Sequence, residues 1–272
     1  MYNAVKFTAC ALACLFMASC SGNNQRAEEA QSLLNEAQYL VEGRDYTGAI
    51  AMLDSLDTAF RDCVDLRRQG TLIRIQALIA LTEDSISADE QRRPDLQHCL
   101  DSLSSQFITV SMQGTAGFRA YKPTFNGAEL NSTCIRPRID ERGYFYAVVN
   151  LQGQRIGLNS IVLDDITVSG QSISMEGSEM MSLSQEVIAP LAEAIYYSSA
   201  SSLTLNLIGS KGRSSIRLSS RDIAAWKSTW YYAKLLQAME TANIRREKYE
   251  NQLETLSSQL SQLTAQQESA AE

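Results

Sequence analysis

The sequence predicts an α+β protein with N-terminal helical hairpins, a central, mainly antiparallel β domain that carries one or two helices, and a long C-terminal helix with coiled-coil character. Three observations lead to this prediction. Apolar residues recur at helical spacing from residue 26 to about 107. From residue 108 to 219 they alternate with polar residues between glycine- and serine-rich turns. No glycine or proline interrupts residues 220–272.

The first region, residues 26–107, carries apolar stripes that are typical of amphipathic helices. One predicted helix stops at Gly43, and Asp45 can cap the next one. A further helix is expected to begin near Pro94, because proline is favoured in the first turn of a helix. The apolar residues of the first two stripes are Leu33, Ala37, Leu40, Val41, Ala49, Ile50, Leu53, Leu56 and Phe60.

Part of this region resembles one tetratricopeptide repeat. The similarity rests on the pattern Tyr39-Leu40-x-x-Gly43-x-Asp45-Tyr46-x-x-Ala49-Ile50-x-x-Leu53-x-x-Leu56. It covers about 35 residues, with no clear second copy at the period of about 34 residues that such arrays show. The proline expected at the end of the repeat is absent, and Arg61 stands near its place. The resemblance implies a hairpin of two close helices, of a kind that often serves protein contacts.

The second region, residues 108–219, is predicted to be the mixed β domain. Residues 144–151 are apolar on both faces, which indicates a central strand. Gln152-Gly153 predicts a turn into the next strand, and a glycine centres a second predicted hairpin within residues 166–175. The amphipathic stretch 183–197 predicts a helix packed on the sheet, and Pro190 within it predicts either a kink or a helix that starts only there.

The third region, residues 220–272, is predicted to be one long helix. Trp226 and Trp230 lie one turn apart near its start and are expected to pack on the sheet. Leucines at a spacing of three and four predict a coiled coil over about residues 235–266. This seam could contact a second copy of the chain, another protein, or the N-terminal helices. Its candidate contact residues are Leu253, Leu256, Leu260 and Leu263.

The first twenty residues form a separate feature. Lys6 precedes an apolar run that is shorter than the roughly 20 apolar residues of a membrane-spanning helix, and the run ends in Met17-Ala18-Ser19-Cys20. This order resembles a bacterial lipoprotein signal peptide, although Met17 stands where leucine is commoner. The resemblance implies removal of residues 1–19 and acylation of Cys20, with residues 20–25 forming the lipidated cysteine and a tether.

The same resemblance implies a location in the cell envelope. A non-acidic residue, Ser21, follows the cysteine, and no acidic cluster comes after it, which favours the outer membrane and its periplasmic face. The formal net charge of −7 argues against nucleic acid, whose phosphates attract basic surfaces. The expected partners are therefore the membrane, through lipid on Cys20, and a protein or a second copy of the chain, through the C-terminal helix.

Three cysteines remain after the signal and the lipidation site are set aside. Cys63 and Cys99 lie in the helical region and could form a disulfide, with Cys134 outside the pair. Equally, all three could be small buried hydrophobic residues. Their spacing does not match a metal or redox motif, so the sequence predicts no metal and no cofactor.

No group of residues specifies a reaction. His98 is the single histidine and is expected on a helix surface rather than in a catalytic dyad with Cys99, because neighbours on a helix do not face each other. Residues 209–214 contain the small and basic residues of a phosphate loop, but a strand pattern follows them, which favours a hairpin turn. Arg136-Pro137-Arg138 predicts an edge strand on which proline blocks further pairing. The acid pairs Asp140-Glu141 and Asp164-Asp165 are expected in turns.

The leading functional hypothesis is a lipid-anchored, non-enzymatic envelope protein that makes protein contacts, for which an exposed leucine stripe from Leu253 to Leu263 is expected. The alternative is a lipoprotein that binds a glycan or peptide in its β domain. That alternative predicts a concave pocket lined by Tyr144, Tyr146 or Trp226 with convergent polar groups. A hydrolase, which needs a nucleophile and base in hydrogen-bond reach, is the third hypothesis.

Overall fold

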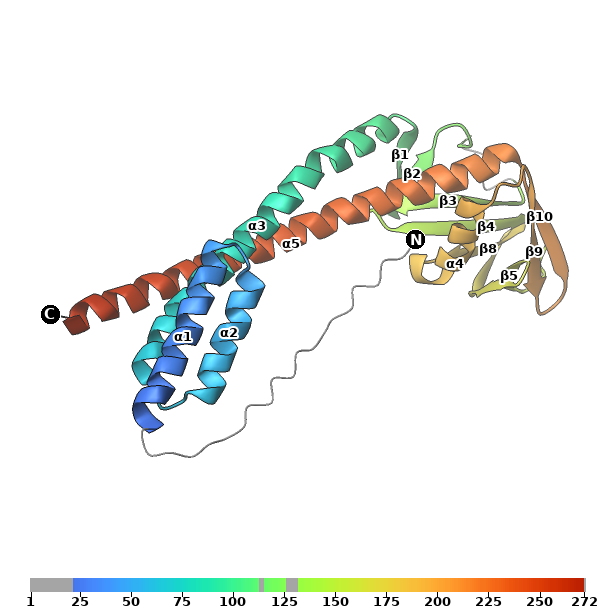
Figure 1. The fold of residues 1–272 in the computed structure, drawn as a ribbon. Helices are drawn as coiled ribbons and strands as arrows, with labels where there is room; N and C mark the ends of the chain where they lie inside the picture. Colours follow the sequence, from blue (N-terminus) through green and yellow to red (C-terminus); the bar gives the residue numbers. More distant parts are fainter. Residues whose placement is uncertain (1–21, 113–114, 126–131, 272) are drawn as a thin grey trace. The chain divides into compact units, whose positions relative to one another are not determined.

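The computed structural model describes residues 22–112, 115–125 and 132–271 of the chain. It confirms the predicted fold class, because helices lie at both ends of the sequence and antiparallel sheets between them (Figure 1). The chain forms two compact units. Unit 1 combines the residues up to Ser85 with those from Tyr249 onward, and unit 2 is Ile86–Lys248. Helices α3 (Val64–Ser104) and α5 (Ser220–Ala271) therefore contribute one part to each unit.

Unit 1 begins with a hairpin of α1 (Gly22–Glu42) and α2 (Tyr46–Ala59). The Asp45 carboxylate accepts a hydrogen bond of 2.9 Å from the backbone N–H of Gly48, so the predicted cap at the start of α2 is confirmed. Small side chains let the two helices approach closely, and leucines fill the space between them. The buried cluster of this hairpin consists of Ala30, Leu34, Ala37, Leu53 and Leu56.

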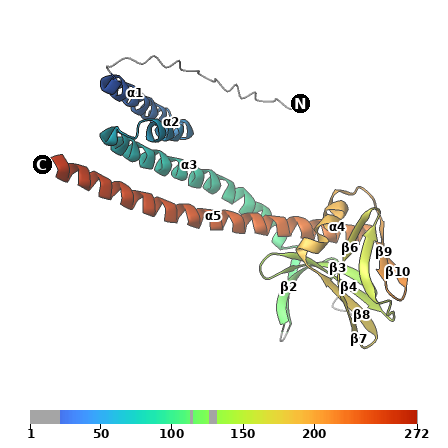
Figure 2. The same ribbon diagram turned by 90° about the horizontal axis from the view of Figure 1, so that it is seen from below.

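The first part of α3 packs on this hairpin through Gly70. A Cβ atom on Gly70 would lie 3.1 Å from side-chain carbons of both Leu53 and Leu56, so a larger residue there would force these leucines to shift. On its other side, the same part of α3 meets the end of α5, since Leu72 of α3 and Leu263 of α5 line one hollow. Figure 2 shows α3 of unit 1 between the α1–α2 hairpin and α5.

Helix α1 begins within the predicted tether. The sequence predicts the lipidated cysteine and a tether over residues 20–25, and in the structure α1 starts at Gly22. Adding a residue to an existing helix fixes one residue per hydrogen bond and costs far less than starting a helix. The polar residues before Arg26 therefore extend the helix that the following buried turns hold in place.

Unit 2 contains two antiparallel sheets in its described residues. The strand order is β1-β2-β3-β4-β8-β7 in the first sheet and β10-β9-β5-β6 in the second. The first sheet is built from β1 (Phe107–Met112), β2 (Thr115–Tyr121), β3 (Cys134–Asp140), β4 (Phe145–Gln152), β7 (Ser172–Met175) and β8 (Ser178–Leu183). The second is built from β5 (Leu158–Leu163), β6 (Ile166–Ser169), β9 (Leu203–Gly209) and β10 (Arg213–Leu218).

Two of the expected hairpins are wrong. β4 pairs with β3 and β8, whereas β5 pairs with β6 and β9, so the chain changes sheets after Gly153. Likewise β6 pairs with β5 and β7 with β8, so the turn at Gly170 joins two sheets and closes no hairpin. The strands themselves were predicted from local alternation, but their pairing depends on contacts between residues that are distant in sequence.

A buried carboxylate joins the two sheets where these changes occur. Glu179 on β8 is only 1% exposed. It accepts hydrogen bonds from the backbone N–H groups of Gly157 at 3.1 Å and Leu158 at 2.7 Å, and from the hydroxyl of Ser172 on β7. Burial by itself would raise the pKa of Glu179, but the hydrogen bonds from Ser172, Leu158 and Gly157 outweigh it and hold that pKa below its usual value.

Helices cover the inner face of the first sheet. Phe145 on β4 lies against Trp226 and Trp230 of α5, with ring centroids 5.6 and 5.1 Å apart. Phe107 on β1 stacks on Tyr232 of α5 at 4.5 Å. Both tryptophans are buried, so their predicted packing on the sheet is confirmed. Helix α4 (Gln185–Tyr197) adds Ile188, Leu191, Ala192 and Ile195 to the same core.

The expected helix start near Pro94 is wrong, because α3 runs without interruption from Val64 to Ser104 with Pro94 inside it. Proline inside a helix removes one backbone hydrogen bond and costs about 3 kcal/mol. Burial of apolar side chains after Pro94 offsets this cost. Leu100 is buried in the core of unit 2, and Leu96, Cys99 and Leu103 pack against that core.

The strand that carries Arg136 and Arg138, β3, is not the edge strand that the sequence predicts. β3 lies between β2 and β4, so it is an inner strand, but β2 pairs only with its last two residues. Pro137 lies outside the pairing with β2 and stands opposite Ala147 in the pairing with β4. Arg136 reaches Asp222 at the start of α5 at 2.6 Å, and the guanidinium of Arg138 lies 3.9 Å from the centre of the Phe118 ring.

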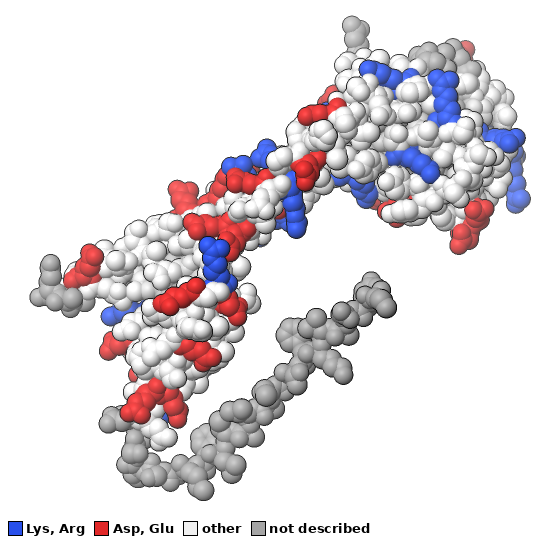
Figure 3. All heavy atoms as spheres, turned by 45° about the horizontal axis from the view of Figure 1, so that its top comes forward, with Lys and Arg blue, Asp and Glu red and all other residues white. Residues whose placement is uncertain are grey.

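Charged side chains are unevenly spread on the face shown in Figure 3. Acidic side chains are frequent over the helices, and basic side chains are scattered over the β part of unit 2, separated by uncharged surface. Within the residues that the structure describes, no helix combines the length and hydropathy of a membrane span.

Candidate functional site

The predicted lipidation site, Cys20, and the signal peptide, residues 1–19, lie outside the described residues. Cys63 and Cys99, the candidate disulfide pair, are free thiols in the structure. Cys63 packs against the core of unit 1 and Cys99 against the core of unit 2, so each fits the alternative of a small hydrophobic residue. Cys134 is buried on β3.

The leucine seam lies within unit 1 and is largely covered. Leu256 is 8% exposed, and Leu253, Leu260 and Leu263 are partly buried. Leu263 lines a hollow together with Leu72 and Arg68 of α3. Of the three partners considered for this seam, the contact with α3 is the one present in the structure. The exposed leucine stripe that a contact protein was expected to show is therefore absent from the described part of α5.

The remaining candidate groups from the sequence do not form a reactive site in the described residues. His98 is exposed on α3. Residues 209–214 connect β9 and β10 as a hairpin, and two amides of that turn, from Ser210 and Lys211, donate to the carbonyls of Gly157 and Ile156. Among the residues that the structure describes, no group of three or more His, Cys, Asp or Glu side chains is arranged to hold a metal ion.

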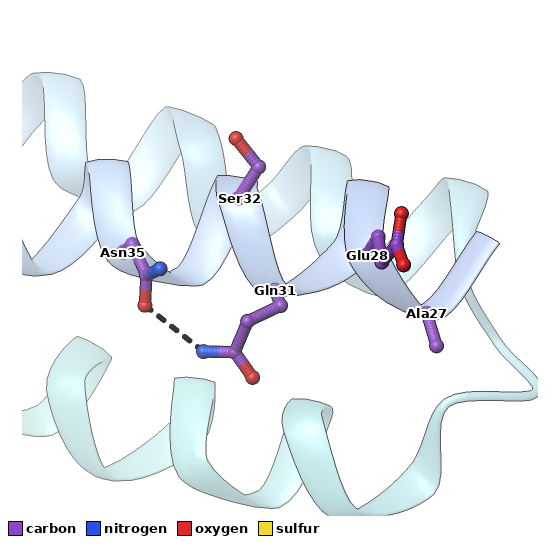
Figure 4. Close-up of a pocket in the computed structure, with 5 residues that line it drawn as sticks. All are labelled: Ala27, Glu28, Gln31, Ser32 and Asn35. Atoms are coloured by element: carbon purple, nitrogen blue, oxygen red, sulfur yellow. Dashed lines mark hydrogen bonds between the residues drawn. The ribbon is translucent and has the colours of Figure 1, made fainter. Parts of the chain in front are cut away.

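One open hollow lies on α1 of unit 1 and is shown in Figure 4. All its lining residues, Ala27, Glu28, Gln31, Ser32 and Asn35, come from this single helix. Gln31 donates a hydrogen bond of 2.9 Å to Asn35 within it. Glu28 is the one titratable side chain, so this surface lacks the convergence of polar groups from several elements that a binding site needs.

A better candidate surrounds the turn between β3 and β4 in unit 2. Asp140 closes this turn, because its carboxylate accepts hydrogen bonds from the backbone N–H groups of Arg142 at 2.9 Å and Tyr144 at 2.8 Å. Gly143 adopts a φ of 85°, and a Cβ atom there would lie 3.1 Å from Leu236 of α5. The turn is thus held against α5, and the Tyr144 side chain, 48% exposed, stands at its end.

Two glutamines fasten the turn further. The side chain of Gln185, at the start of α4, accepts a hydrogen bond of 2.9 Å from the backbone N–H of Phe145. Gln237 of α5 hydrogen-bonds to Gln185 and donates to the carbonyl of Gly143 at 3.3 Å. Three elements (β4, α4 and α5) therefore fix the backbone on either side of Tyr144, which lowers the ordering cost of binding at this place.

Tyr144 and Arg142 line two neighbouring hollows, which we call together the Tyr144 site. The first hollow has a volume of about 510 Å³ and is lined also by Asp140, Phe145, Tyr146, Ser182, Ser184, Gln185 and Glu186. The second has a volume of about 580 Å³ and is lined also by Glu141, Gln237, Glu240, Thr241 and Ile244. Both volumes fall in the range of small-ligand sites, roughly 300–1,000 Å³.

Hydrogen bonds hold two of the carboxylates that line the site. A hydrogen bond from the Ser184 hydroxyl and one from the backbone N–H of Glu186 itself lower the pKa of the exposed Glu186 carboxyl. Glu141 accepts a hydrogen bond of 2.8 Å from the backbone N–H of Gly117 on β2. The site therefore combines two tyrosines, hydroxyl and amide groups, and several carboxylates, an arrangement suited to binding.

The sequence indicated Tyr144, Tyr146 and Trp226 as candidate lining residues. The two tyrosines line the site, whereas Trp226 is buried against Phe145 and does not. The sequence missed Gln185, Gln237 and Glu240, whose helices meet the turn only in the folded unit. No local signal marks these three residues, since glutamine and glutamate are ordinary on helix surfaces. A scan against protein-family models found no match, and searches of curated proteins and of solved structures found no significant similarity.

Proposed function

We propose that this protein is a lipid-anchored, non-enzymatic protein of the cell envelope that binds an extended ligand, a peptide or a glycan, at the Tyr144 site. The anchor part of the proposal rests on the sequence resemblance at Cys20, with the outer membrane and its periplasmic face as the expected location. The binding part rests on one observation. A concave surface with Tyr144, Tyr146 and convergent polar groups is present in the β domain.

The geometry favours the Tyr144 site over the leucine seam as the place where a partner binds. The seam is used inside unit 1, where Leu256 is buried, whereas the Tyr144 side chain is half exposed on a turn held by three elements. Exposed aromatic side chains with few rotatable bonds give large contact area at a low entropic cost. A protein contact remains part of the proposal if the ligand is a peptide segment of a partner.

The proposal is tested with a soluble form, residues 21–272, which keeps every described residue. Its binding is measured by titration calorimetry against pentapeptides in which alanine alternates with lysine, glutamate or serine, and against neutral trisaccharides of glucose or N-acetylglucosamine. We expect at least one probe to bind, and Tyr144→Ala to weaken that binding by about tenfold or more, the effect of losing a stacked or cation-facing ring.

Tyr39→Ala is the matched control, because Tyr39 is an exposed tyrosine on α1 in the other unit. It is expected to bind as the unchanged protein does. Tyr144→Ala keeps the backbone hydrogen bonds of the turn, since Tyr144 contributes to them through its N–H and carbonyl. If no probe binds in a manner that depends on Tyr144, the proposed function is wrong.

A further inference from the structure

The charges that line the Tyr144 site are unbalanced. Four acidic residues, Asp140, Glu141, Glu186 and Glu240, line the two hollows, and Arg142 is the one basic residue among their lining residues. The acidic residues come from the β3–β4 turn, from the start of α4 and from the middle of α5, so the imbalance is not a run of acids on one helix. A concave surface with one sign of charge raises the local concentration of ligands with the opposite sign.

The uncharged part of the site also favours a cation. The side chains of Tyr144 and Tyr146 line the first hollow, and the face of a tyrosine ring attracts ammonium and guanidinium groups within about 6 Å. Ile244, which is 59% exposed, offers an apolar surface in the second hollow. Lysine and arginine side chains match this combination, because an apolar stem precedes their charged end.

The two hollows share the exposed side chain of Tyr144 in their linings. An extended peptide places alternate side chains on the same side, about 6.6–6.8 Å apart at 3.3–3.4 Å per residue. Such a chain can cross Tyr144 with one side chain in each hollow. A neutral glycan would use the rings and hydroxyl groups but would leave the four carboxylates without a counter-charge.

We propose that the ligand of the Tyr144 site is an extended, positively charged peptide segment of another protein. Its cationic side chains enter the two hollows next to Glu186 and Glu240, and its backbone crosses the Tyr144 ring. This inference rests on the proposed function, of which it specifies the ligand class. Arg142, the one basic lining residue, belongs to the linings of both hollows.

The test compares charge variants in the same titration. The lysine–alanine pentapeptide is expected to bind, the serine–alanine pentapeptide to bind more weakly, and the glutamate–alanine pentapeptide not to bind. Glu240→Gln and Glu186→Gln should each weaken binding of the lysine peptide by about threefold, and Arg142→Gln should strengthen it by about threefold, in line with an exposed ion pair. Glu176→Gln is the matched control, because Glu176 is an exposed acid on the β7–β8 turn outside the site.

The Arg142→Gln variant is the decisive one. A variant that only disturbs the shape of the site would weaken binding of the lysine peptide, whereas removal of a repelling charge should strengthen it. Raising the salt concentration from 0.05 to 0.3 M should weaken binding of the lysine peptide several-fold. If a neutral trisaccharide or the glutamate peptide binds better, and Tyr144→Ala abolishes that binding, the cationic ligand is wrong while the proposed function stands. If Tyr144→Ala leaves the binding of every probe unchanged, both proposals are wrong.

Discussion

The buried carboxylate of Glu179 is predicted to be a main determinant of the stability of unit 2. Glu179→Ala leaves the N–H groups of Gly157 and Leu158 without their acceptor, and Leu158 is buried. An unsatisfied buried donor costs about 1–3 kcal/mol, and hydrogen bonds to a charged group contribute about 1.5–3 kcal/mol each. The Ser172 hydroxyl is only partly buried and can turn to water. We therefore expect the free energy of unfolding to fall by roughly 3–5 kcal/mol.

Glu179→Gln tests the charge at nearly constant shape. One amide oxygen can still accept from Leu158 and Ser172, but the amide nitrogen then faces the N–H of Gly157, where two donors meet. The expected loss is roughly 2–3 kcal/mol at neutral pH. Glu176→Gln removes the same charge from an exposed turn three residues earlier and is expected to change stability by less than about 0.5 kcal/mol.

The pH dependence follows from the lowered pKa of Glu179. Its folded-state pKa lies below the unfolded value of about 4.3. The stabilisation from the ionised carboxylate is therefore fully present above about pH 4.3 and is lost as the pH falls through the folded-state pKa. The difference in stability between the unchanged protein and Glu179→Gln should be constant from pH 7 to 5 and should shrink at lower pH.

Tryptophan fluorescence during urea unfolding measures this effect directly. The chain has two tryptophans, and both, Trp226 and Trp230, are buried against Phe145 in unit 2. The signal therefore follows the unit in which Glu179 lies. The reasoning is refuted if Glu179→Gln and Glu176→Gln have equal unfolding free energies at pH 7, or if their difference stays the same down to pH 3.

Two further predictions concern the helix with an internal proline and the membrane anchor. Pro94→Ala should raise the free energy of unfolding of unit 2 by about 1–3 kcal/mol in the same fluorescence assay, because Pro94 is exposed inside α3 and alanine restores the missing N–H; an unchanged or lower value would contradict it. Cys20→Ala should release the protein into the soluble fraction or leave an uncleaved precursor, as judged by membrane fractionation and mass spectrometry. Cys14→Ala is its control, and unchanged processing and membrane partition of Cys20→Ala would refute the lipoprotein assignment.

Local periodicity was enough to predict the elements of this fold but not the pairing of its strands. The cap at Asp45 and the long helix from Ser220 follow from neighbouring residues, and both are present. At the change of sheet after Gly153, the backbone N–H groups of Gly157 and Leu158 bind Glu179, which lies some way along the chain and looks like an ordinary polar residue of a strand. Its partners are mostly backbone N–H groups, which no side-chain pattern reveals.

Only part of the candidate site was predictable, because local patterns reveal single residues but not the contacts between distant segments. Tyr144 and Tyr146 could be chosen from the sequence, because a tyrosine offers an apolar ring and a polar hydroxyl to a ligand. The carboxylates opposite them could not, since Glu186 and Glu240 belong to two different helices whose meeting with the turn is a tertiary event. Charge imbalance within a site is therefore visible only after folding, although the chain as a whole is acidic.

The covered leucine seam changes where a partner would be recognised. Partner choice in coiled coils depends on charged flanking positions, and serine, glutamine and threonine surround these leucines. In unit 1, burial of Leu256 and the hollow shared by Leu263 and Leu72 assign the seam to α3. A second chain would have to displace that contact before it could use the same leucines. The Tyr144 site requires no such displacement, because its aromatic side chain is already exposed on a fixed turn, and this difference favours the turn as the place of binding.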